Sequence, residues 1–290
     1  MDYLTYLVAK CCYETLRRIP FAASHNLAKF LAFFMQYIIR YRKAVLEQNL
    51  KLAFPVISET KLNKIIKGVY YNFACFIVEL LQSWRLNKEF YAQNFNVHNR
   101  EVFEKALNEN KGLILLTGHL ANFEWTGSYV CSEYPPLYAV MKRLHNPYIN
   151  DLIVKTREKM GFKLLYTRDT YKKALEKLKN KNIVALIADQ DARHRGVFVD
   201  FFGKSASTAK GAAILHLKTG APIIVGINIR RGWGKFDLYC ERVPIDNDLK
   251  LSEENIFTIT QRHTKILEKW IREYPEQYLW THKRWKTKPW

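Results

Sequence analysis

Lys111-Gly-Leu-Ile-Leu-Leu-Thr117-Gly118-His119-Leu-Ala-Asn-Phe-Glu124-Trp125 is the clearest indication of the fold class in this chain of 290 residues. Its first seven residues form a short apolar run, which is typical of a strand buried on both faces of a parallel sheet. Gly118 and His119 follow directly, and a helical pattern then extends over about 122–131. A strand that leads through a short turn into a helix is the repeating unit of an α/β fold.

The rest of the chain repeats this alternation of apolar runs and helical patterns. Helical patterns occupy 147–160 and 171–179, and further apolar runs lie at 137–141, 162–166, 183–188 and 222–229. The alternation predicts a largely parallel sheet flanked by helices. We expect an N-terminal helical region over residues 1–100 and an α/β domain over 101–290. In such sheets ligands bind beyond the carboxyl ends of the strands, which is where His119 lies.

His119 and Glu124 are candidates for a catalytic pair. Five positions along one helix would separate the two side chains by about 140°, so they could not meet. With His119 in the turn and Glu124 on the first helical turn, imidazole and carboxylate come within hydrogen-bond reach. The carboxylate would then set the tautomer of the base. No activated Ser or Cys stands beside them, so the base would act directly on a substrate hydroxyl. At this spacing alone, a satisfied core histidine is the commoner case.

The net charge of +19 favours anionic partners, which could be nucleic acid, anionic lipid headgroups or an acidic carrier protein. The 7 Trp and 17 Tyr residues suit a membrane interface, although aromatic side chains also stack on single-stranded nucleic acid. No helix-turn-helix, zinc-finger or RNP pattern occurs, so we expect no nucleic-acid partner. The five cysteines lack the spacing of zinc sites, and we expect neither a metal nor a cofactor.

Residues 19–39 form an apolar run bracketed by basic residues. As a helix the run would be about 31 Å long, enough to cross a bilayer. Lys29 at its centre would oppose a spanning helix by about 2.5–3.5 kcal/mol. At helical spacing, one narrow stripe of the helix surface contains polar residues: Arg18, His25, Lys29, Gln36, Arg40 and Lys43. The pattern favours a helix lying in the plane of a membrane surface over a true span, with an ordinary buried helix as the alternative.

Three separated blocks carry a family resemblance. The segment Thr117-Gly-His119-Leu-Ala-Asn-Phe-Glu124-Trp resembles the H-x4-D/E motif of the lipid A biosynthesis acyltransferases, which belong to the lysophospholipid acyltransferase superfamily. A second block of that family is similar to Asp189-Gln-Asp191, Gly196-Val-Phe-Val-Asp-Phe-Phe-Gly203, Thr208 and Gly211. The C-terminal signature of the family is similar to Pro275-Glu-Gln-Tyr-Leu-Trp280-Thr-His282-Lys-Arg284-Trp-Lys286. The resemblance runs from about residue 20 to the end.

The resemblance implies a glycerolipid-acyltransferase-like domain on the cytoplasmic face of the cell inner membrane. The implied reaction moves a fatty acyl chain from acyl carrier protein, or acyl-CoA, to a hydroxyl of a lipid A precursor. His119 would be the base and Glu124 its partner, and Asp189 matches an acidic residue important in the family. One departure concerns Lys142 and Arg143, which stand where the family usually has Arg-Pro before its Asn-Pro pair.

Several substrate-binding roles stay open. Lys142 or Arg143 would supply positive charge to the oxyanion or bind an acceptor phosphate. Gly203, Lys204, Ser207 and Thr208 suit a phosphate-binding turn before a helix, although Ser207 could simply cap that helix. In the tail, Trp280 and Trp285 could form a basic aromatic patch or pack on the sheet, and we expect Arg284 and Lys286 to face anions.

Two other enzymatic functions are alternatives. Asp189-Gln-Asp191 after a strand has the spacing of a metal site in a glycosyltransferase. An acyltransferase acting on another glycolipid or a lysophospholipid would share His119 and Glu124.

Overall fold

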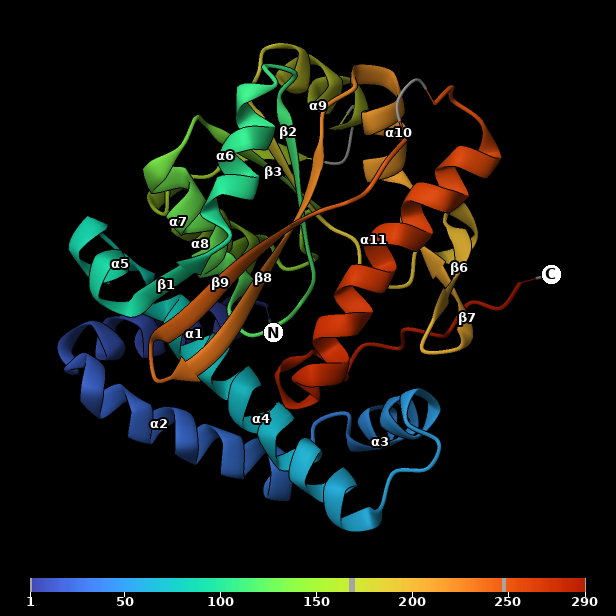
Figure 1. The fold of residues 1–290 in the computed structure, drawn as a ribbon. Helices are drawn as coiled ribbons and strands as arrows, with labels where there is room; N and C mark the ends of the chain where they lie inside the picture. Colours follow the sequence, from blue (N-terminus) through green and yellow to red (C-terminus); the bar gives the residue numbers. More distant parts are fainter. Residues whose placement is uncertain (1, 167–169, 247–248, 290) are drawn as a thin grey trace.

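The computed structural model describes residues 2–166, 170–246 and 249–289, which include a seven-stranded sheet in the order β1-β9-β8-β2-β5-β3-β4 (Figure 1). Every neighbouring pair is parallel except β8 and β9, which form an antiparallel hairpin. The predicted α/β class with a largely parallel sheet is therefore confirmed. The strands of this sheet are β1 (Phe95–His98), β2 (Leu113–Thr117), β3 (Leu137–Met141), β4 (Lys163–Tyr166), β5 (Ile183–Ile187), β8 (Ile223–Gly232) and β9 (Lys235–Arg242).

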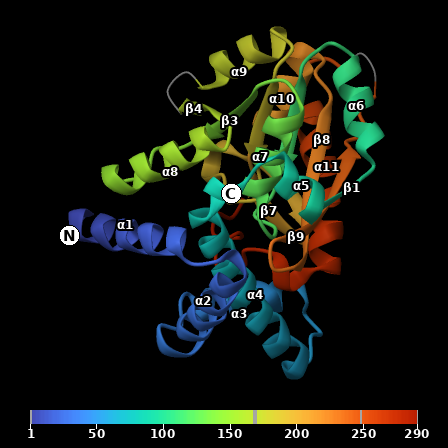
Figure 2. The ribbon, with the colours of Figure 1, turned by 90° about the vertical axis from the view of Figure 1, so that its left-hand side faces the viewer.

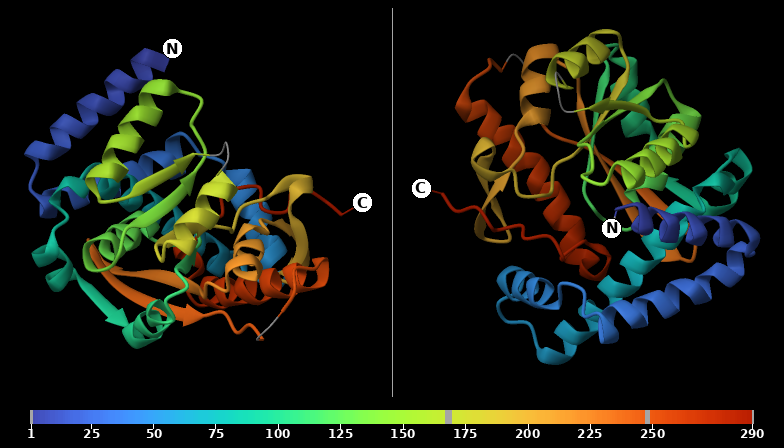
Figure 3. Two further views of the ribbon diagram at one scale, coloured as in Figure 1. Left: turned by 90° about the horizontal axis from the view of Figure 1, so that it is seen from above. Right: turned by 180° about the vertical axis from the view of Figure 1, so that it is seen from behind.

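Helices cover both faces of the sheet, which Figure 3 shows from above and from behind. Alternate residues of β2 divide between two apolar clusters: Leu113 and Leu115 pack toward α6 and α7, while Ile114 and Leu116 pack toward α9, α10 and α11. This double burial explains the continuous apolar run. The covering helices are α6 (Arg100–Asn108), α7 (Phe123–Glu133), α8 (Pro147–Lys159), α9 (Thr170–Lys179), α10 (Gly211–Thr219) and α11 (Glu253–Glu273).

The five strands and three helices predicted between residues 111 and 229 are all present, with ends that differ by at most three residues. The sequence patterns did not predict β1, β9 or the separate hairpin of β6 (Val197–Phe201) and β7 (Lys204–Thr208). β1 is an edge strand and β9 lies next to it, and β6–β7 packs against α11. These strands are only partly buried, so they lack the long apolar runs that mark the central strands.

The N-terminal region consists of helices that pack below the sheet. Residues of α3 and α4 join the same apolar cluster as β2 and β8, so one core spans both parts of the chain. In Figure 1 α2 runs along α4, and in Figure 2 α1 extends beside α8. The elements of this region are α1 (Asp2–Arg18), α2 (Phe21–Phe33), η1 (Phe34–Ile38), α3 (Lys43–Ala53), α4 (Glu59–Leu81), η2 (Ser83–Arg85) and α5 (Lys88–Asn94). The 3-10 turns η3 (Arg193–Arg195) and η4 (Pro275–Gln277) lie later in the chain.

The apolar run at 19–39 folds as α2 followed by the π-helical turn η1. Across the described residues, no helix combines the length and apolar character that crossing a membrane requires. The small residues Ser24, Ala28 and Ala32 face the protein, which brings α2 close to α4. The large apolar side chains point outward instead. We call this exposed surface the apolar ledge, formed by Leu27, Phe30, Phe33, Phe34, Tyr37, Ile38 and Ile39.

Candidate active site

The turn after β2 is held by the C-terminal segment. The amide of Leu279 donates to the carbonyl of His119 at 3.0 Å, and the amide of Ala121 donates to the carbonyl of Gln277 at 2.9 Å. Leu120 and Tyr278 form an isolated antiparallel bridge between the two segments. Ala121 has a φ of +44°, a left-handed conformation that alanine adopts only under constraint. The C-terminal block therefore supports the backbone that presents His119.

The carboxylate that binds the imidazole belongs to Asp189, just beyond the end of β5. Oδ1 of Asp189 lies 2.8 Å from Nδ1 of His119, and Oδ2 accepts the backbone N–H of His119 at 3.0 Å. β2 and β5 are neighbouring parallel strands, so their carboxyl ends meet. A Cβ at Gly118 would lie 3.2 Å from Cδ2 of Leu267, so a larger residue here would crowd α11. Asp189 thus occupies the place predicted for Glu124.

The other ring nitrogen of His119 remains available for chemistry. The side-chain amide nitrogen of Gln190 lies 3.4 Å from Nε2. The ionised carboxylate of Asp189 can only accept, so Nδ1 carries the proton of the neutral ring and Nε2 is left as an acceptor. The imidazole is partly exposed (19%), whereas the Asp189 side chain is nearly enclosed (3%). This tautomer is the one required of a general base acting through Nε2.

The neighbouring carboxylate of Asp189 increases the proton affinity of His119. Burial by itself lowers the pKa of His119, but the charge and hydrogen bond of Asp189 outweigh burial, and the pKa is raised above its ordinary value. Burial raises the pKa of Asp189, yet the charge of His119 and hydrogen bonds from its ring and backbone prevail and hold the pKa at about 2. Asp189 is therefore ionised at neutral pH, when it stabilises a protonated imidazole.

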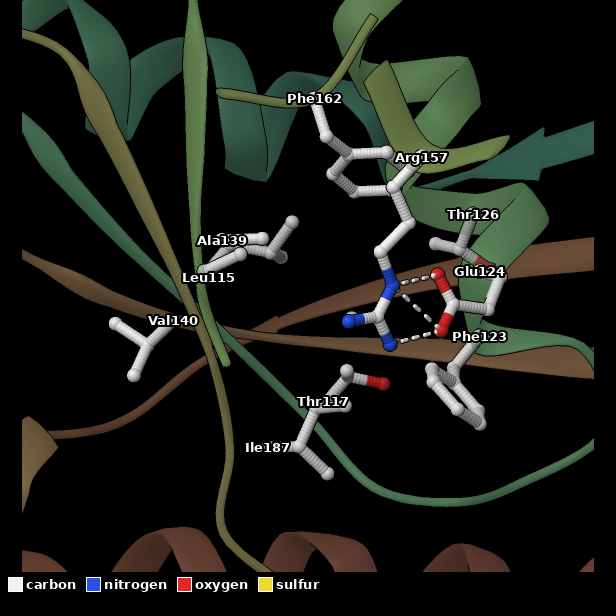
Figure 4. A pocket seen from close by; sticks show the side chains of 13 residues that line it. Leu115, Thr117, Phe123, Glu124, Thr126, Ala139, Val140, Arg157, Phe162 and Ile187 are labelled. Carbon is white, nitrogen blue, oxygen red and sulfur yellow. Dashed lines mark hydrogen bonds and ion pairs between the residues drawn. The ribbon is translucent and has the colours of Figure 1, made fainter. Parts of the chain in front are cut away.

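Glu124 contacts a different residue from the one predicted. Its carboxylate forms a forked ion pair with the guanidinium of Arg157 on α8, with Nε at 3.0 Å from Oε2 and 3.2 Å from Oε1 (Figure 4). The expected hydrogen bond between Glu124 and His119 was therefore wrong, although the negative charge of Glu124 still contributes to the raised pKa of His119. Glu124 lies on the first turn of α7, as predicted, but its side chain turns toward α8.

An apolar cavity of about 50 Å³ adjoins the Glu124–Arg157 pair. Figure 4 shows the pair beside the aliphatic side chains of β2, β3 and β5, with Phe162 farther in and Phe123 near Glu124. Gly127 is also part of the wall, and a Cβ at this position would lie 2.5 Å from two ring atoms of Phe162. The remaining wall consists of Leu115, Thr117, Thr126, Ala139, Val140, Ala185, Ile187 and Gly226. A polar rim over an apolar interior suits a hydrocarbon chain attached to a reactive polar group.

A buried polar network fixes the start of α7. Glu79 on α4 forms a completely buried ion pair with Arg230 on β8, and its Oε2 accepts from Asn122 at 2.8 Å. Asn122 caps α7, because its side-chain oxygen accepts the amide of Trp125 at 3.1 Å. Asn228 donates to the Asn122 carbonyl at 3.0 Å. The network therefore ties the helix that carries Glu124 to both α4 and the sheet.

Lys142 and Arg143 lie just after β3, and both are exposed. The guanidinium of Arg143 sits over the Tyr166 ring at 5.0 Å. Asn146 caps α8 by accepting the amides of Tyr148 and Ile149. Because β3 is a neighbour of β5, the structure places both basic residues at the edge of the sheet that carries Asp189.

The predicted phosphate-binding turn is not a turn before a helix. Residues 204–208 form strand β7, and Gly203 belongs to the hairpin turn, where its amide donates to Asp200. Ser207 does not cap α10; its hydroxyl donates to the carbonyl of Arg193. Thr208 is buried and accepts from Arg284. Antiparallel pairing with β6 makes this segment a strand, which the helix-cap interpretation missed.

The structure also corrects the expectation for Arg284 and argues against the alternative of a glycosyltransferase metal site. Arg284 is 2% exposed and donates to Ser207 and Thr208, so it does not face external anions. Both oxygens of Asp189 are engaged by His119, and Oδ2 of Asp191 accepts from Thr287. The Asp189-Gln-Asp191 segment therefore does not present a pair of open carboxylates as a glycosyltransferase would require.

The sequence interpretation missed Arg157, Gln190 and Tyr278. Tyr278 donates to the carbonyl of Asp189 at 3.3 Å. Arg157 had a detectable signal: it follows Ile149 and Ile153 at four-residue spacing, which puts a basic residue on an apolar helix stripe. Gln190 and Tyr278 had no such sequence signal beyond their positions in the second block and the C-terminal signature.

Comparison with known proteins identifies the family of this chain. The profile of the family described as bacterial lipid A biosynthesis acyltransferase matches residues 1–287. The lipid A biosynthesis palmitoleoyltransferase of Escherichia coli K12 is 26% identical over 87% of this chain and 81% of its own length. The lauroyltransferase of the same organism is 24% identical over 94% and 88%. A phosphatidylinositol mannoside acyltransferase of Mycolicibacterium smegmatis is 27% identical over 62% and 59%.

The family profile covers nearly the whole chain, including the His119 turn, the Asp189 segment and the C-terminal block that supports them. The parallel α/β sheet agrees with the fold expected from the resemblance. This chain belongs to the bacterial lipid A biosynthesis acyltransferase family and is an O-acyltransferase of lipid A biosynthesis.

Proposed function

We propose that the enzyme transfers a fatty acyl chain from acyl carrier protein, or acyl-CoA, to a hydroxyl of a lipid A precursor, with His119 as general base. The observation that carries the proposal is the pair of contacts around the imidazole. Asp189 binds Nδ1, which leaves Nε2 as an acceptor, and the Gln190 amide lies 3.4 Å from Nε2. A donor thioester needs an acceptor alcohol that loses its proton during attack, and an oriented Nε2 supports that step.

The proton and bond changes balance within this site. Nε2 of His119 takes the proton of the acceptor hydroxyl as its oxygen attacks the thioester carbonyl. The tetrahedral intermediate collapses, the C–S bond breaks and the leaving thiolate takes the proton back from the imidazolium. Asp189 keeps Nδ1–H oriented and stabilises the imidazolium in between, through the 2.8 Å contact.

The ion pair of Glu124 and Arg157 positions the donor in this proposal. The pair lies at the rim of the apolar cavity, within electrostatic reach of His119. The cavity takes the acyl chain, and the guanidinium of Arg157 stabilises the negative charge that develops on the carbonyl oxygen. A volume of about 50 Å³ is small for a ligand site, so the surrounding side chains move when a chain enters.

Positive charge outside the cavity suits the other substrate groups. Lys142 and Arg143 are exposed beyond β3, where they bind an acceptor phosphate or assist the oxyanion. The apolar ledge on α2 and η1 attaches the protein to the cytoplasmic face of the inner membrane, with anionic lipids meeting the basic residues around it. The membrane is where a lipid acceptor resides.

A second acceptor class has specific support. The mycobacterial relative named a phosphatidylinositol mannoside acyltransferase matches 62% of this chain. The same base and cavity would acylate the hydroxyl of another glycolipid, because neither contacts the sugar in this mechanism.

The decisive experiment measures acyl transfer from labelled acyl carrier protein to a tetraacylated lipid A precursor in detergent. His119→Ala should abolish transfer, whereas His98→Ala should retain it, because His98 lies on edge strand β1 and stacks on Tyr239. Wild-type protein that is folded but transfers no chain from several donors would contradict this acceptor. Transfer to a phosphatidylinositol mannoside instead would support the second acceptor class.

A further inference from the structure

Four aromatic side chains and His119 form a continuous series of ring contacts. Tyr41 stacks on Phe73 with 5.9 Å between centroids, Phe73 on Phe76 at 6.5 Å, and Phe76 on Phe123 at 5.3 Å. Phe123 then meets the imidazole of His119 edge-on at 4.8 Å. We call Tyr41, Phe73, Phe76 and Phe123 the aromatic ladder. It joins the segment after η1 to the catalytic base by way of α4.

The outer end of the aromatic ladder adjoins the apolar ledge. Tyr41 is 36% exposed and follows Ile38 and Ile39, which are 61% and 55% exposed. Arg40 and Arg42 flank it, and the Arg42 guanidinium lies over the Tyr41 ring at 5.8 Å. Exposed hydrocarbon beside guanidinium groups is complementary to a lipid, whose chains are apolar and whose headgroup is anionic.

Three of the four ladder rings line a hollow and are not enclosed in the core. Phe73, Phe76 and Phe123 are half-buried, in contrast to the enclosed neighbours Val69 and Asn72 on the same helix. All three rings line a hollow between α4 and the C-terminal segment 277–279, and His119 is part of its wall. Apolar rings left partly open along one line give a lipid chain a surface to follow.

We propose that the aromatic ladder guides an acyl chain of the acceptor lipid from the bilayer to His119. The inference rests on the proposed acyltransferase function and adds the route of one substrate. Phe123 lines both this hollow and the cavity beside Glu124 and Arg157, so two apolar compartments meet at the base. Transfer between two lipid-like substrates needs two such compartments. The hollow, which the contact of Phe73 with Tyr41 links to the membrane-facing ledge, serves the acceptor, and the cavity beside Glu124 serves the donor chain.

Photocrosslinking tests the route without depending on turnover. A photoreactive benzoylphenylalanine is placed at Phe73 or Phe76, and the protein is added to phosphatidylethanolamine/phosphatidylglycerol vesicles that contain a labelled tetraacylated lipid A precursor. Both positions should crosslink to the labelled acceptor. The matched control is Phe257 on α11, which is 42% exposed but lies outside the hollow and should remain unlabelled. Phe33 in the ledge should crosslink to bulk lipid.

Three outcomes would overturn the proposal. Phe33 could crosslink while Phe73 and Phe76 do not, Phe33 could fail to reach lipid at all, or the ladder positions could instead crosslink to the chain of labelled acyl carrier protein. Because crosslinking needs no acyl transfer, these results remain distinct from a failure of the proposed function, which would appear as absent transfer by wild-type enzyme.

Kinetics provides a second readout. Phe73→Ser and Phe76→Ser should each raise the KM for the vesicle-borne acceptor about tenfold, the effect of losing one buried aromatic contact. Phe76→Leu should recover most of the affinity, because it restores an apolar surface, and thermal unfolding verifies that each variant is folded. A rise confined to the KM of the donor would assign the ladder to the other substrate and refute the route.

Discussion

Nδ1 of His119 and Oδ1 of Asp189 lie 2.8 Å apart, although 70 residues separate them in the chain. The same carboxylate also accepts the backbone N–H of His119 through Oδ2. The double contact fixes both the ring and the turn that carries it. The orienting acid of this site therefore comes from the end of β5 and lies outside the H-x4-E motif.

Asp189→Asn should reduce kcat by about a thousandfold or more, because an amide favours the wrong tautomer of the imidazole. The charge of Asp189 raises the pKa of His119, so its loss should move the acid limb of kcat/KM to lower pH. Steady-state rates between pH 5 and 9 measure both effects. Asp191→Asn is the matched control and should leave the acid limb in place. An unshifted limb in Asp189→Asn would contradict the pairing.

Glu124 and Arg157 should act as one unit. Glu124→Ala and Arg157→Ala should each lower kcat by about a hundredfold or more, since each removes the forked pair that holds the guanidinium in position. The double variant should be no slower than the worse single variant. Losses that multiply in the double variant would mean that the two side chains act independently.

The buried ion pair beneath α7 should matter chiefly for stability. Glu79→Ala leaves Arg230 enclosed without its counter-ion and Asn122 without its acceptor, which should lower the free energy of unfolding by about 3–5 kcal/mol. Arg231→Ala breaks the exposed pair with Asp237 and should lower it by less than about 1 kcal/mol. Urea unfolding provides both values, and equal losses would show that burial of the first pair has no special effect.

Donor selectivity should depend on the wall of the apolar cavity. Gly127→Ala adds a methyl group that meets the Phe162 ring at 2.5 Å, so the cavity should shrink and long-chain donors should lose rate more than short-chain donors. Phe162→Leu should shift the preference toward longer chains. The measurement is the relative rate for acyl carrier proteins that carry different chains. An unchanged ratio in both variants would place the chain elsewhere.

His263 should make the protein less stable in mild acid. It is fully buried, neither ring nitrogen has a partner in the described part of the chain, and burial together with the charge of Arg284 lowers its pKa to about 3. In the unfolded chain His263 binds a proton near pH 6.5, whereas in the folded protein it binds one only near pH 3. The free energy of unfolding should therefore fall with decreasing pH across this window, by about 1.4 kcal/mol per unit.

His263→Leu should remove that contribution to the slope. Urea unfolding of both proteins from pH 6.5 to 4.5 is the appropriate comparison, because Asp189, with its pKa at about 2, titrates below this range. Parallel slopes for the wild type and the variant would show that His263 is already protonated in the folded state.

Local pattern was sufficient for the five apolar strands and the helices between them, but not for β1, β9 or the β6–β7 hairpin. β2, β3, β4, β5 and β8 are covered on both faces, so they read as apolar runs, and the helices between them carry the spacing of half-buried helices. A residue directly after such a strand must lie at the carboxyl edge of the sheet. That rule alone placed His119 in the site.

The partners of each side chain required the folded protein. Asp189 reaches His119 because β5 lies next to β2, and periodicity carries no information about which strands are neighbours. Glu124 turns to Arg157 because α8 packs beside α7 and supplies a charge that satisfies the buried carboxylate. Sequence spacing therefore located His119, the proposed base. The orienting acid, the arginine at the cavity and the aromatic ladder arise from strand order and helix packing, which bring together groups that are distant in the chain.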